Sequence, residues 1–160
     1  MSKDKNNKTN AMRIIERKKL KYEAIFYESD GFLDGITIAD KLEKPRNMVF
    51  KTLVTEGKSR EYFVFVLPVE KELDLKKAAK TVGEKSVEMI NVNDILKVSG
   101  YIRGGCSPIG MKKEYKTVVD GSALKLDEIM FSGGKRGLQL VMNPNDLKTA
   151  TNCIFADITM

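Results

Sequence analysis

The sequence contains no histidine at all, and its only cysteines are Cys106 and Cys153. The lack of histidine excludes imidazole general bases, Ser-His-Asp and Cys-His catalysis, and histidine-ligated metals. Two cysteines without a CxxC spacing predict neither a disulfide framework nor a metal or redox pair. Any chemistry must therefore use other side chains, backbone groups or the substrate itself, and we expect neither a cofactor nor a metal.

Long apolar runs are lacking as well. The first ten residues, MSKDKNNKTN, contain no apolar stretch of the signal-peptide kind, and no run approaches the ~20 apolar residues of a membrane span. We therefore expect a cytoplasmic protein with no membrane partner. Residues 1–9 are rich in Lys and Asn, which predicts a disordered tail ahead of one domain over residues 10–160.

Basic residues are in excess in this chain of 160 residues. Lys and Arg number 28 against 22 Asp and Glu, which gives a formal net charge of +6 and a pI of about 9.2. This charge is compatible with a partner that carries phosphates, because bound lysines and arginines release counterions from it. Many basic proteins bind no nucleic acid, however, so charge alone leaves the partner open.

The hydrophobic pattern predicts many strands with irregularly spaced helices, which favours a compact α+β domain. Asn10 is the expected cap of a first helix that begins at Ala11, and Asn143 is the expected cap of a last helix that begins at Pro144. The other expected helices cover residues 37–44, 75–82 and 92–98. The expected strands cover residues 22–28, 48–54, 62–67, 86–90, 115–119, 128–132, 138–142 and 153–158, with 48–54 and 62–67 forming a hairpin.

Lys51 interrupts an otherwise apolar strand, MVFKTLV, at residues 48–54. A lysine in such a strand must reach out to solvent, pair with a carboxylate or face a cavity. Burial would lower its pKa and suit it to act as a base or as a polarising cation. The alternative is a lysine on an edge strand that points to water, and the local sequence does not decide between the two.

Two glycine-rich segments are candidate ligand-binding loops. GGCSPIG, at residues 104–110, can bring backbone N–H groups close to a carbonyl oxygen or phosphate, or can be an ordinary turn. SGGKRG, at residues 132–137, lacks the GxxxxGK[ST] pattern of a phosphate loop, so we reject a nucleotide triphosphatase. Its Lys135 and Arg136 can contact a nucleic-acid phosphate or lie on a solvated turn.

The other cysteine and lysine candidates are more simply explained by structure than by function. Cys106 lies inside the first glycine loop, but no histidine can activate it, which favours a bystander over a nucleophile. Cys153 follows the pattern of a core residue. Lys112 and Lys113 are typical of a solvated face, although they can also help to hold RNA.

Four segments in the same order resemble the YbaK/EbsC family of bacterial aminoacyl-tRNA deacylases, which are related to the editing domain of some prolyl-tRNA synthetases. The resemblance covers the chain from about Ile14 to its end. The segments are FKTLV (50–54), LKKAAK (75–80), SGYIRGGCSPIGMKK (99–113) and FSGGKRG (131–137).

This resemblance implies a mixed, barrel-like β-sheet surrounded by helices, with a pocket at one side of the sheet. It also implies hydrolytic removal of a wrong amino acid from tRNA, with Cys-tRNA(Pro) as the characteristic substrate. The family's essential lysine falls on Lys51, and its other pocket residues fall on Thr52, Tyr27, Ser132 and the backbone of Gly104. Around that glycine, Gly105, Cys106 and Ser107 are expected to complete the loop that holds the substrate. The family's pocket aromatic falls on Asp34, which does not match, and that role is not carried over.

In such enzymes the thiolate of the substrate cysteine attacks its own ester, so the enzyme needs no nucleophile. Under this hypothesis Lys51 positions the substrate and favours the thiolate, while N–H groups of Gly104 and Gly105 stabilise the oxyanion. The alternatives are a deacylase that uses water on another small amino acid, and a non-catalytic module that binds tRNA or a synthetase. The expected partners are aminoacylated tRNA, tRNA(Pro) in the first case, and prolyl-tRNA synthetase.

Overall fold

The computed structural model describes residues 8–160 and contains five α-helices within that range. The predicted tail over residues 1–9 lies outside the described residues except for Lys8 and Thr9. The α-helices are α2 (Asn10–Arg17), α3 (Gly35–Lys41), α4 (Leu75–Val82), α5 (Ile95–Ser99) and α6 (Pro144–Thr151). Short 3₁₀ turns are η1 (Arg46–Met48), η2 (Val92–Asp94) and η3 (Gly121–Lys125). None of the helices in residues 8–160 is long and apolar enough to cross a membrane.

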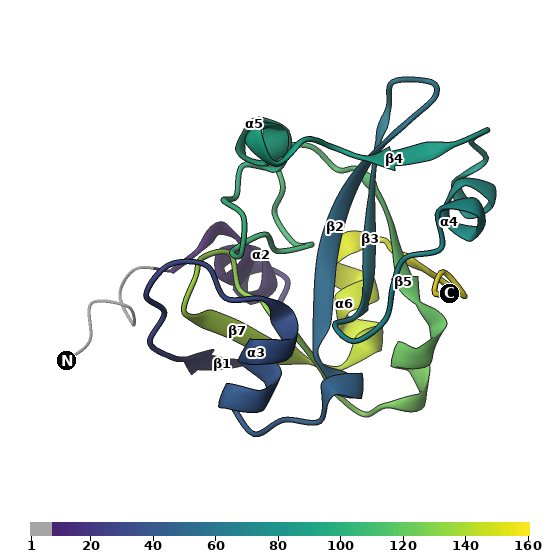
Figure 1. Cartoon of the computed structure of the whole chain (residues 1–160). Helices are drawn as coiled ribbons and strands as arrows, with labels where there is room; N and C mark the ends of the chain where they lie inside the picture. Colours follow the sequence, from purple (N-terminus) through teal and green to yellow (C-terminus); the bar gives the residue numbers. More distant parts are fainter. Residues whose placement is uncertain (1–7) are drawn as a thin grey trace.

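The strands form two sheets (Figure 1). A mixed five-stranded sheet has the order β4-β2-β3-β5-β8, and an antiparallel three-stranded sheet has the order β1-β7-β6. The strands are β1 (Glu23–Phe26), β2 (Phe50–Gly57), β3 (Tyr62–Pro68), β4 (Val87–Met89), β5 (Lys116–Asp120), β6 (Ile129–Ser132), β7 (Leu138–Met142) and β8 (Ile154–Ala156). A parallel bridge between Val49 and Met130 joins the sheets. The α+β class is confirmed, and the sheet expected as one barrel-like unit consists of these two parts.

The predicted β2–β3 hairpin is confirmed, and its apolar runs serve two separate cores. Thr52 pairs with Val66 and Leu53 with Phe65. Because side chains alternate between the faces of a strand, Val64 and Val66 pack into the largest cluster, under α2 and the small sheet. Phe65 and its alternate neighbours pack into a second cluster that includes α4. Burial of both faces explains why these strands show no polar alternation.

Helix ends differ from the prediction where a capping side chain has a tertiary partner. Thr9, not Asn10, caps α2: the Thr9 hydroxyl accepts a hydrogen bond from the Met12 N–H at 3.3 Å. The Asn10 amide instead donates to the carbonyl oxygen of Gly110, 2.8 Å away. Since this contact spans 100 residues of sequence, local pattern could not reveal it. The cap at Asn143 and the Pro144 start of α6 are confirmed.

Other boundaries shift modestly. Helix α3 begins two residues before the predicted position 37 because Asp34 caps it. The helix predicted over residues 92–98 is divided into η2 and α5, and the predicted first and last strands are shorter than expected. In Figure 1 the small sheet and α3 lie on one side of β2, while α4 lies on the other side.

Candidate active site

A cavity of about 380 Å³ opens beside the middle of β2. Its walls come from β2, the segment before α3, the first glycine loop, the β4–α5 connection and the ends of β6 and β7. The lining residues with polar or charged groups at the cavity are Asp34, Lys51, Thr52, Arg103, Gly104, Cys106, Ser132 and Gln139. The remaining lining is mostly aliphatic, with Phe32 and Phe50 as its aromatic residues.

The cavity exists because one edge of β2 is only partly paired. On that edge β4 pairs with Thr55, Glu56 and Gly57, and the bridge to β6 involves Val49. Between these points, no strand within residues 8–160 pairs with β2 on that edge. Val54 directs its carbonyl to this edge, where it accepts a hydrogen bond from the Ile90 N–H. Because backbone direction alternates along a strand, the Thr52 N–H and carbonyl also face the open edge.

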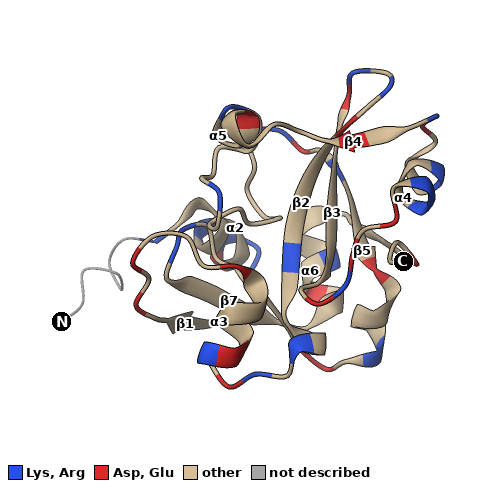
Figure 2. Cartoon of the chain, in the orientation of Figure 1, with Lys and Arg blue, Asp and Glu red and all other residues tan. Residues whose placement is uncertain are grey.

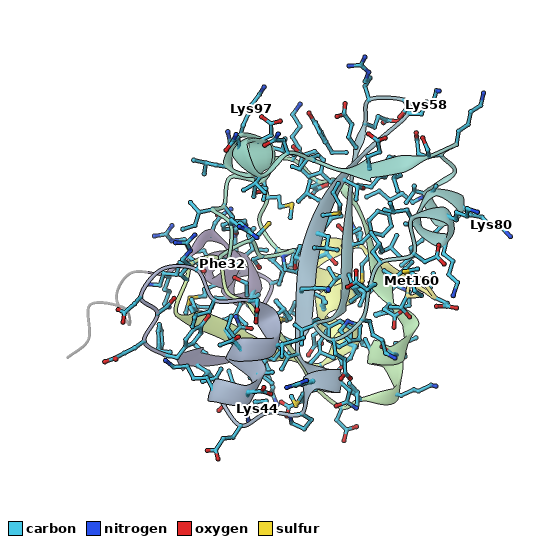
Figure 3. The ribbon with its side chains drawn as sticks, viewed as in Figure 1. Phe32, Lys44, Lys58, Lys80, Lys97 and Met160 are labelled. Atoms are coloured by element: carbon cyan, nitrogen blue, oxygen red, sulfur yellow. The ribbon has the colours of Figure 1, made fainter. Side chains whose placement is uncertain are left out.

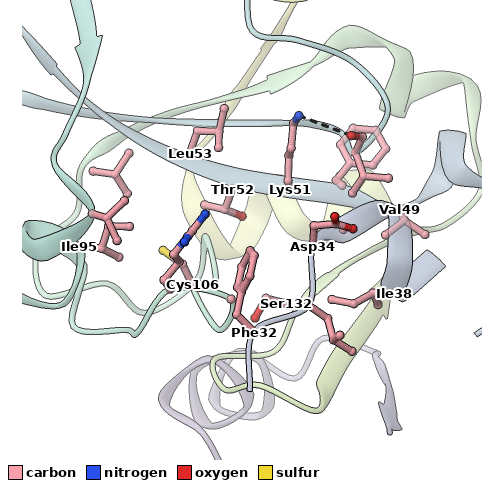
Figure 4. A pocket seen from close by; sticks show the side chains of 18 of the residues that line it. Phe32, Asp34, Ile38, Val49, Lys51, Thr52, Leu53, Ile95, Cys106 and Ser132 are labelled. Atoms are coloured by element: carbon pink, nitrogen blue, oxygen red, sulfur yellow. Dashed lines mark hydrogen bonds between the residues drawn. The ribbon is translucent and has the colours of Figure 1, made fainter. Parts of the chain in front are cut away.

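Lys51 lies at this gap and is half-buried. Its Nζ is 3.5 Å from the carbonyl oxygen of Val69, the contact dashed in Figure 4, and no described carboxylate forms an ion pair with it. Burial lowers the pKa of the Lys51 ammonium, and the negative charge of Glu72 partly opposes this shift. Figure 2 shows the middle of β2 as a basic segment among uncharged neighbours. The structure therefore places Lys51 at a cavity rather than on a water-facing edge.

Thr52 points to the opposite face of β2, towards Phe32 and Ser132 in Figure 4. Its hydroxyl is buried and has no hydrogen-bond partner in the described chain. Most buried hydroxyls are hydrogen-bonded, so an exception beside a cavity requires an explanation. A group brought by a ligand is one partner that this hydroxyl can acquire.

The first glycine loop reaches the cavity through Gly104 but not through Gly105, which corrects the expected pair of oxyanion donors. The Gly105 N–H donates to the carbonyl oxygen of Ile102 at 2.9 Å. Gly105 is itself buried and does not line the cavity. A Cβ at position 105 would lie 2.8 Å from the Cα of Lys135. Gly105 is thus the point where the two glycine-rich segments pack backbone to backbone.

Cys106 lines the cavity, and burial raises the pKa of its thiol to about 11, against a smaller opposing effect of the Ser99 hydroxyl. The thiol is therefore protonated near neutral pH and a poor nucleophile, as the missing histidine suggested. Cys153 is fully buried in the largest core cluster.

Two expected pocket residues do not line the cavity. Tyr27 follows β1, and its backbone N–H donates to the carbonyl oxygen of Gly137 at 2.9 Å. Ser107 is fully buried, and its hydroxyl accepts a hydrogen bond from the Ile109 N–H at 3.3 Å. Both contacts hold loops next to the cavity, so the structure gives these residues supporting positions. Ser132, at the end of β6, does reach the lining.

Sequence reasoning missed three lining residues with aromatic or polar side chains: Phe32, Arg103 and Gln139. Phe32 lies two residues before Asp34 and supplies an aromatic ring close to where the family resemblance places one. Gln139 is only 4% exposed and pairs with Ser132 in the small sheet. Its neighbours Leu138 and Leu140 point into the largest core cluster, so its own side chain points to the other face. The polar residue in the apolar run LQLVM was the available signal for Gln139.

Asp34, where the expected aromatic is missing, has a structural role and also lines the cavity. Its Oδ1 accepts a hydrogen bond from the Thr37 N–H at 2.7 Å, which caps α3 and holds the pKa of the carboxyl below its usual value. The carboxylate is therefore ionised at neutral pH and keeps a negative charge at the cavity wall.

The four basic residues expected to contact tRNA occupy two regions. Arg136 lies beside Phe32, which lines the cavity, and the Nζ of Lys135 is 6.0 Å from the centroid of the Phe26 ring. Lys113 instead lines a separate cavity of about 420 Å³ between the ends of α2 and α6, and Lys112 packs against Gly100. Of these four residues, Arg136 is the one whose side chain lies beside a residue of the cavity lining.

Comparison with known proteins gives a consistent result. The sequence profile of the aminoacyl-tRNA editing domain matches residues 36–150. A protein of Enterococcus faecalis, provisionally named Cys-tRNA(Pro)/Cys-tRNA(Cys) deacylase EbsC, is 45% identical over 95% of this chain and 93% of its own length.

Two solved structures share the fold. The hypothetical protein APE2540 superposes with a TM-score of 0.87 at 21% identity, over 95% of this chain and all of that one. A provisional trans-editing enzyme for prolyl-tRNA synthetase superposes with a TM-score of 0.81 at 20% identity, over 94% and 95% of the two chains. With the profile match and the 45% identical relative, these findings show that the chain belongs to the aminoacyl-tRNA editing domain family.

Proposed function

We propose that this chain is a trans-editing deacylase that removes cysteine from mischarged Cys-tRNA(Pro). The observation that carries the proposal is a small cavity with a buried lysine but no activated nucleophile, in a chain of this family. The activity is also the one in the name of the Enterococcus faecalis relative. A volume of about 380 Å³ suits an aminoacyl group and a terminal ribose better than a larger ligand.

The reaction needs no enzyme nucleophile because the substrate brings its own. The cysteine thiolate attacks the carbonyl carbon of its ester, a C–S bond forms and the C–O bond to the terminal ribose breaks. Cysteine leaves as a cyclic thiolactone, and the ribose oxygen takes up a proton to restore the tRNA hydroxyl. This pathway accounts for a site that contains neither histidine nor an ionised cysteine.

In this scheme the Lys51 ammonium positions the terminal ribose or phosphate and favours the thiolate by its charge. The oxyanion receives hydrogen bonds from two backbone N–H groups, that of Gly104 in the first glycine loop and that of Thr52 at the open edge of β2. Each pre-organised donor of this kind typically contributes about 3–4 kcal/mol to transition-state stabilisation. The Thr52 N–H takes the place of the Gly105 N–H as the second donor, because the Gly105 N–H already donates to the carbonyl oxygen of Ile102.

Asp34 is the candidate for recognition of the substrate's α-ammonium group. Its carboxylate is ionised, lies at the cavity and has one oxygen fixed by the Thr37 N–H. The second oxygen is left to accept a charge-assisted hydrogen bond from the ammonium. This role differs from the aromatic role that the family resemblance places at this position.

The test is deacylation of Cys-tRNA(Pro) by the wild type, Lys51→Ala and Lys58→Ala. Lys58 lies on the hairpin turn at the far end of β2 and is labelled in Figure 3, so its variant controls for a general loss of positive charge. We expect Lys51→Ala to lose at least a hundredfold in rate and Lys58→Ala to match the wild type. Activity of Lys51→Ala near the wild-type level would show that the assignment is wrong.

A panel of mischarged tRNAs distinguishes the two chemical routes. If the substrate thiol is the nucleophile, Ser-tRNA(Pro) should be cleaved far more slowly than Cys-tRNA(Pro), because a hydroxyl is a much weaker nucleophile at neutral pH. Equal rates would favour attack by water. Binding of tRNA without turnover of any member would favour the non-catalytic module.

A free-standing domain of this size offers few determinants for one tRNA, so we propose that prolyl-tRNA synthetase supplies part of the specificity. Addition of the synthetase should raise the preference for Cys-tRNA(Pro) over Cys-tRNA(Cys). An unchanged ratio of the two rates would argue against this partner.

A further inference from the structure

Two arginines lie against one aromatic ring at the mouth of the cavity. We call this cluster of Phe32, Arg103 and Arg136 the arginine clamp. The guanidinium carbon of Arg103 is 4.2 Å from the centroid of the Phe32 ring, and that of Arg136 is 6.0 Å from it. Phe32 is 42% exposed although it lines the cavity, and Figure 3 labels it between the small sheet and α5.

Contacts with backbone groups hold the Arg136 side chain of the clamp in place. The Arg136 Nε donates a hydrogen bond to the backbone carbonyl of Arg103 at 3.0 Å. Gly104, with a φ of +85°, packs so closely that a Cβ there would lie 2.9 Å from the Phe32 ring and 3.2 Å from the Arg136 Nε. Side chains held in this way lose little further entropy when a ligand binds.

The two arginines of the clamp form no ion pair within the described residues. Within residues 8–160 the ion pairs are Lys8–Glu16, Arg46–Asp40 and Lys77–Asp157, all away from this cluster. No described carboxylate therefore lies within ion-pair distance of Arg103 or Arg136. Two guanidinium groups without an ion-pair partner in the described chain, at the entrance of a cavity, favour an anionic group that arrives with the ligand.

We propose that the arginine clamp binds the phosphodiester backbone of a single-stranded RNA end, next to the nucleotide whose ribose enters the cavity. This inference rests on the proposed function for the identity of the ligand. A planar guanidinium presents paired N–H donors that match the geometry of a phosphate. The exposed ring and the guanidinium planes also offer a stacking surface for an unpaired base.

The clamp adds Arg103 to the expected tRNA contacts and separates Arg136 from Lys113. Lys113 lies at the other cavity, whose lining includes Tyr115 and Arg17, and within the described residues these two form no cation–π contact. A role for Lys112 and Lys113 in holding RNA would therefore concern a more distant part of the tRNA. The clamp alone adjoins the place where the terminal nucleotide must lie.

The test uses an RNA hairpin that carries no amino acid and has a single-stranded 3′ ACCA end. Its affinity for the protein is measured by fluorescence anisotropy between 50 and 200 mM salt. The variants are Arg103→Gln and Arg136→Gln. Arg60→Gln, on the exposed β2–β3 turn, is the matched control. We expect each clamp variant to bind roughly fivefold to tenfold more weakly and to reduce the salt slope by about 0.7, the value for one phosphate contact on a single strand. The Arg60 variant should bind like the wild type.

A blunt hairpin without the four unpaired nucleotides tests the location of the contact. The wild type and both clamp variants should bind this RNA equally. Arg103→Lys retains the charge without the planar fork and should give an intermediate affinity. If the Gln variants bind the ACCA hairpin like the wild type, or weaken the blunt hairpin to the same degree, the clamp does not hold the RNA end.

Because the RNA carries no amino acid, this outcome is independent of deacylation. Loss of turnover with clamp-dependent binding intact would count against the proposed reaction only. Unchanged binding by the clamp variants, with deacylation by the wild type, would count against the clamp only. Thermal unfolding of each variant, expected within a few degrees of the wild type, verifies that the fold is kept.

Discussion

Replacement of Thr52 by valine should stabilise the protein, which is the reverse of the usual effect of a change on a buried strand. The Thr52 hydroxyl is buried without a hydrogen-bond partner in the described chain. Such a group keeps the cost of its lost hydration, typically about 1–3 kcal/mol, and gains nothing in return. Valine has the same shape and a similar strand preference, so the substitution removes this cost without a cavity.

We expect an increase of about 1 kcal/mol in the free energy of unfolding, at the lower end of that range because neighbouring groups relax. For a chain of this length, 1 kcal/mol corresponds to a rise in Tm of about 2–4 °C. If substrate binding supplies the missing partner, kcat/KM for deacylation should fall at the same time by about fivefold, the worth of one neutral hydrogen bond. A gain in stability paired with a loss in activity is typical of a residue kept for function.

Two matched substitutions make the result interpretable. Thr55 lies on the same strand, but its hydroxyl donates to the carbonyl oxygen of Phe63 at 3.0 Å, so Thr55→Val should lower the stability by about 1 kcal/mol. Ser122, in η3 and away from the cavity, has a buried hydroxyl without a hydrogen-bond partner among residues 8–160, so Ser122→Ala should leave deacylation unchanged and not lower the Tm. Calorimetry and urea titration measure all three. If Thr52→Val destabilises as much as Thr55→Val, the argument from the unpaired hydroxyl is refuted.

Four further predictions follow from the site. Lys51→Met should stabilise the protein at pH 7, because burial lowers the pKa of Lys51 and so disfavours its charged form in the folded state. This gain in the free energy of unfolding should shrink as the pH rises towards 10.5, where the unfolded lysine also loses its proton. Urea titrations that show the same difference between the variant and the wild type at every pH would contradict this reasoning. Cys106, with a pKa of about 11, should resist alkylation at pH 8 until urea unfolds the chain, and rapid labelling of the native protein would argue for an exposed thiolate. Because the thiol is no nucleophile in the proposed reaction, Cys106→Ala should keep deacylase activity. Asp34→Asn should keep the α3 cap and the Tm but raise KM for deacylation, whereas Asp34→Ala should raise KM and also lower the free energy of unfolding by about 1 kcal/mol. Equal KM values for the wild type and Asp34→Asn would argue against a role of Asp34 in binding the ammonium group. Gly105→Ala should destabilise by about 1–3 kcal/mol, because its Cβ would meet the Lys135 backbone, and a neutral effect on the Tm would mean that the two loops separate readily.

The parts of the fold that sequence could predict are those determined by local pattern. The β2–β3 hairpin follows from two apolar runs around a polar turn, and α4 ends at Gly83 because glycine adopts the left-handed conformation there, with a φ of 74°. The open edge of β2 was not predictable, since it depends on where β4 and β6 stop pairing with it. Lys51 could be singled out from the sequence, but only this topology explains why it faces a cavity.

The candidate site was predicted best where one residue type determines the chemistry and worst where backbone contacts do. Absence of histidine already excluded enzyme nucleophiles of the common kinds, and the neutral Cys106 thiol agrees with that exclusion. The donor role expected of Gly105 failed because its N–H is bonded within its own turn, a detail that a glycine count cannot give. Phe32 and Arg103 escaped notice because their significance comes from a ring and a guanidinium brought together from segments about seventy residues apart.

Thr52 and Thr55 show most clearly what pairing topology adds to sequence. Both are threonines on one strand, and nothing in residue type separates them. Thr55 lies where β2 is paired on both edges, and its hydroxyl is satisfied by the neighbouring strand. Thr52 lies where one edge is open, and its hydroxyl and its outward backbone groups have no partner there among the described residues. The interruption in the pairing of β2 therefore leaves polar groups available at one place only, beside Lys51, and this is where a substrate that supplies its own nucleophile needs only positioning and electrostatic support.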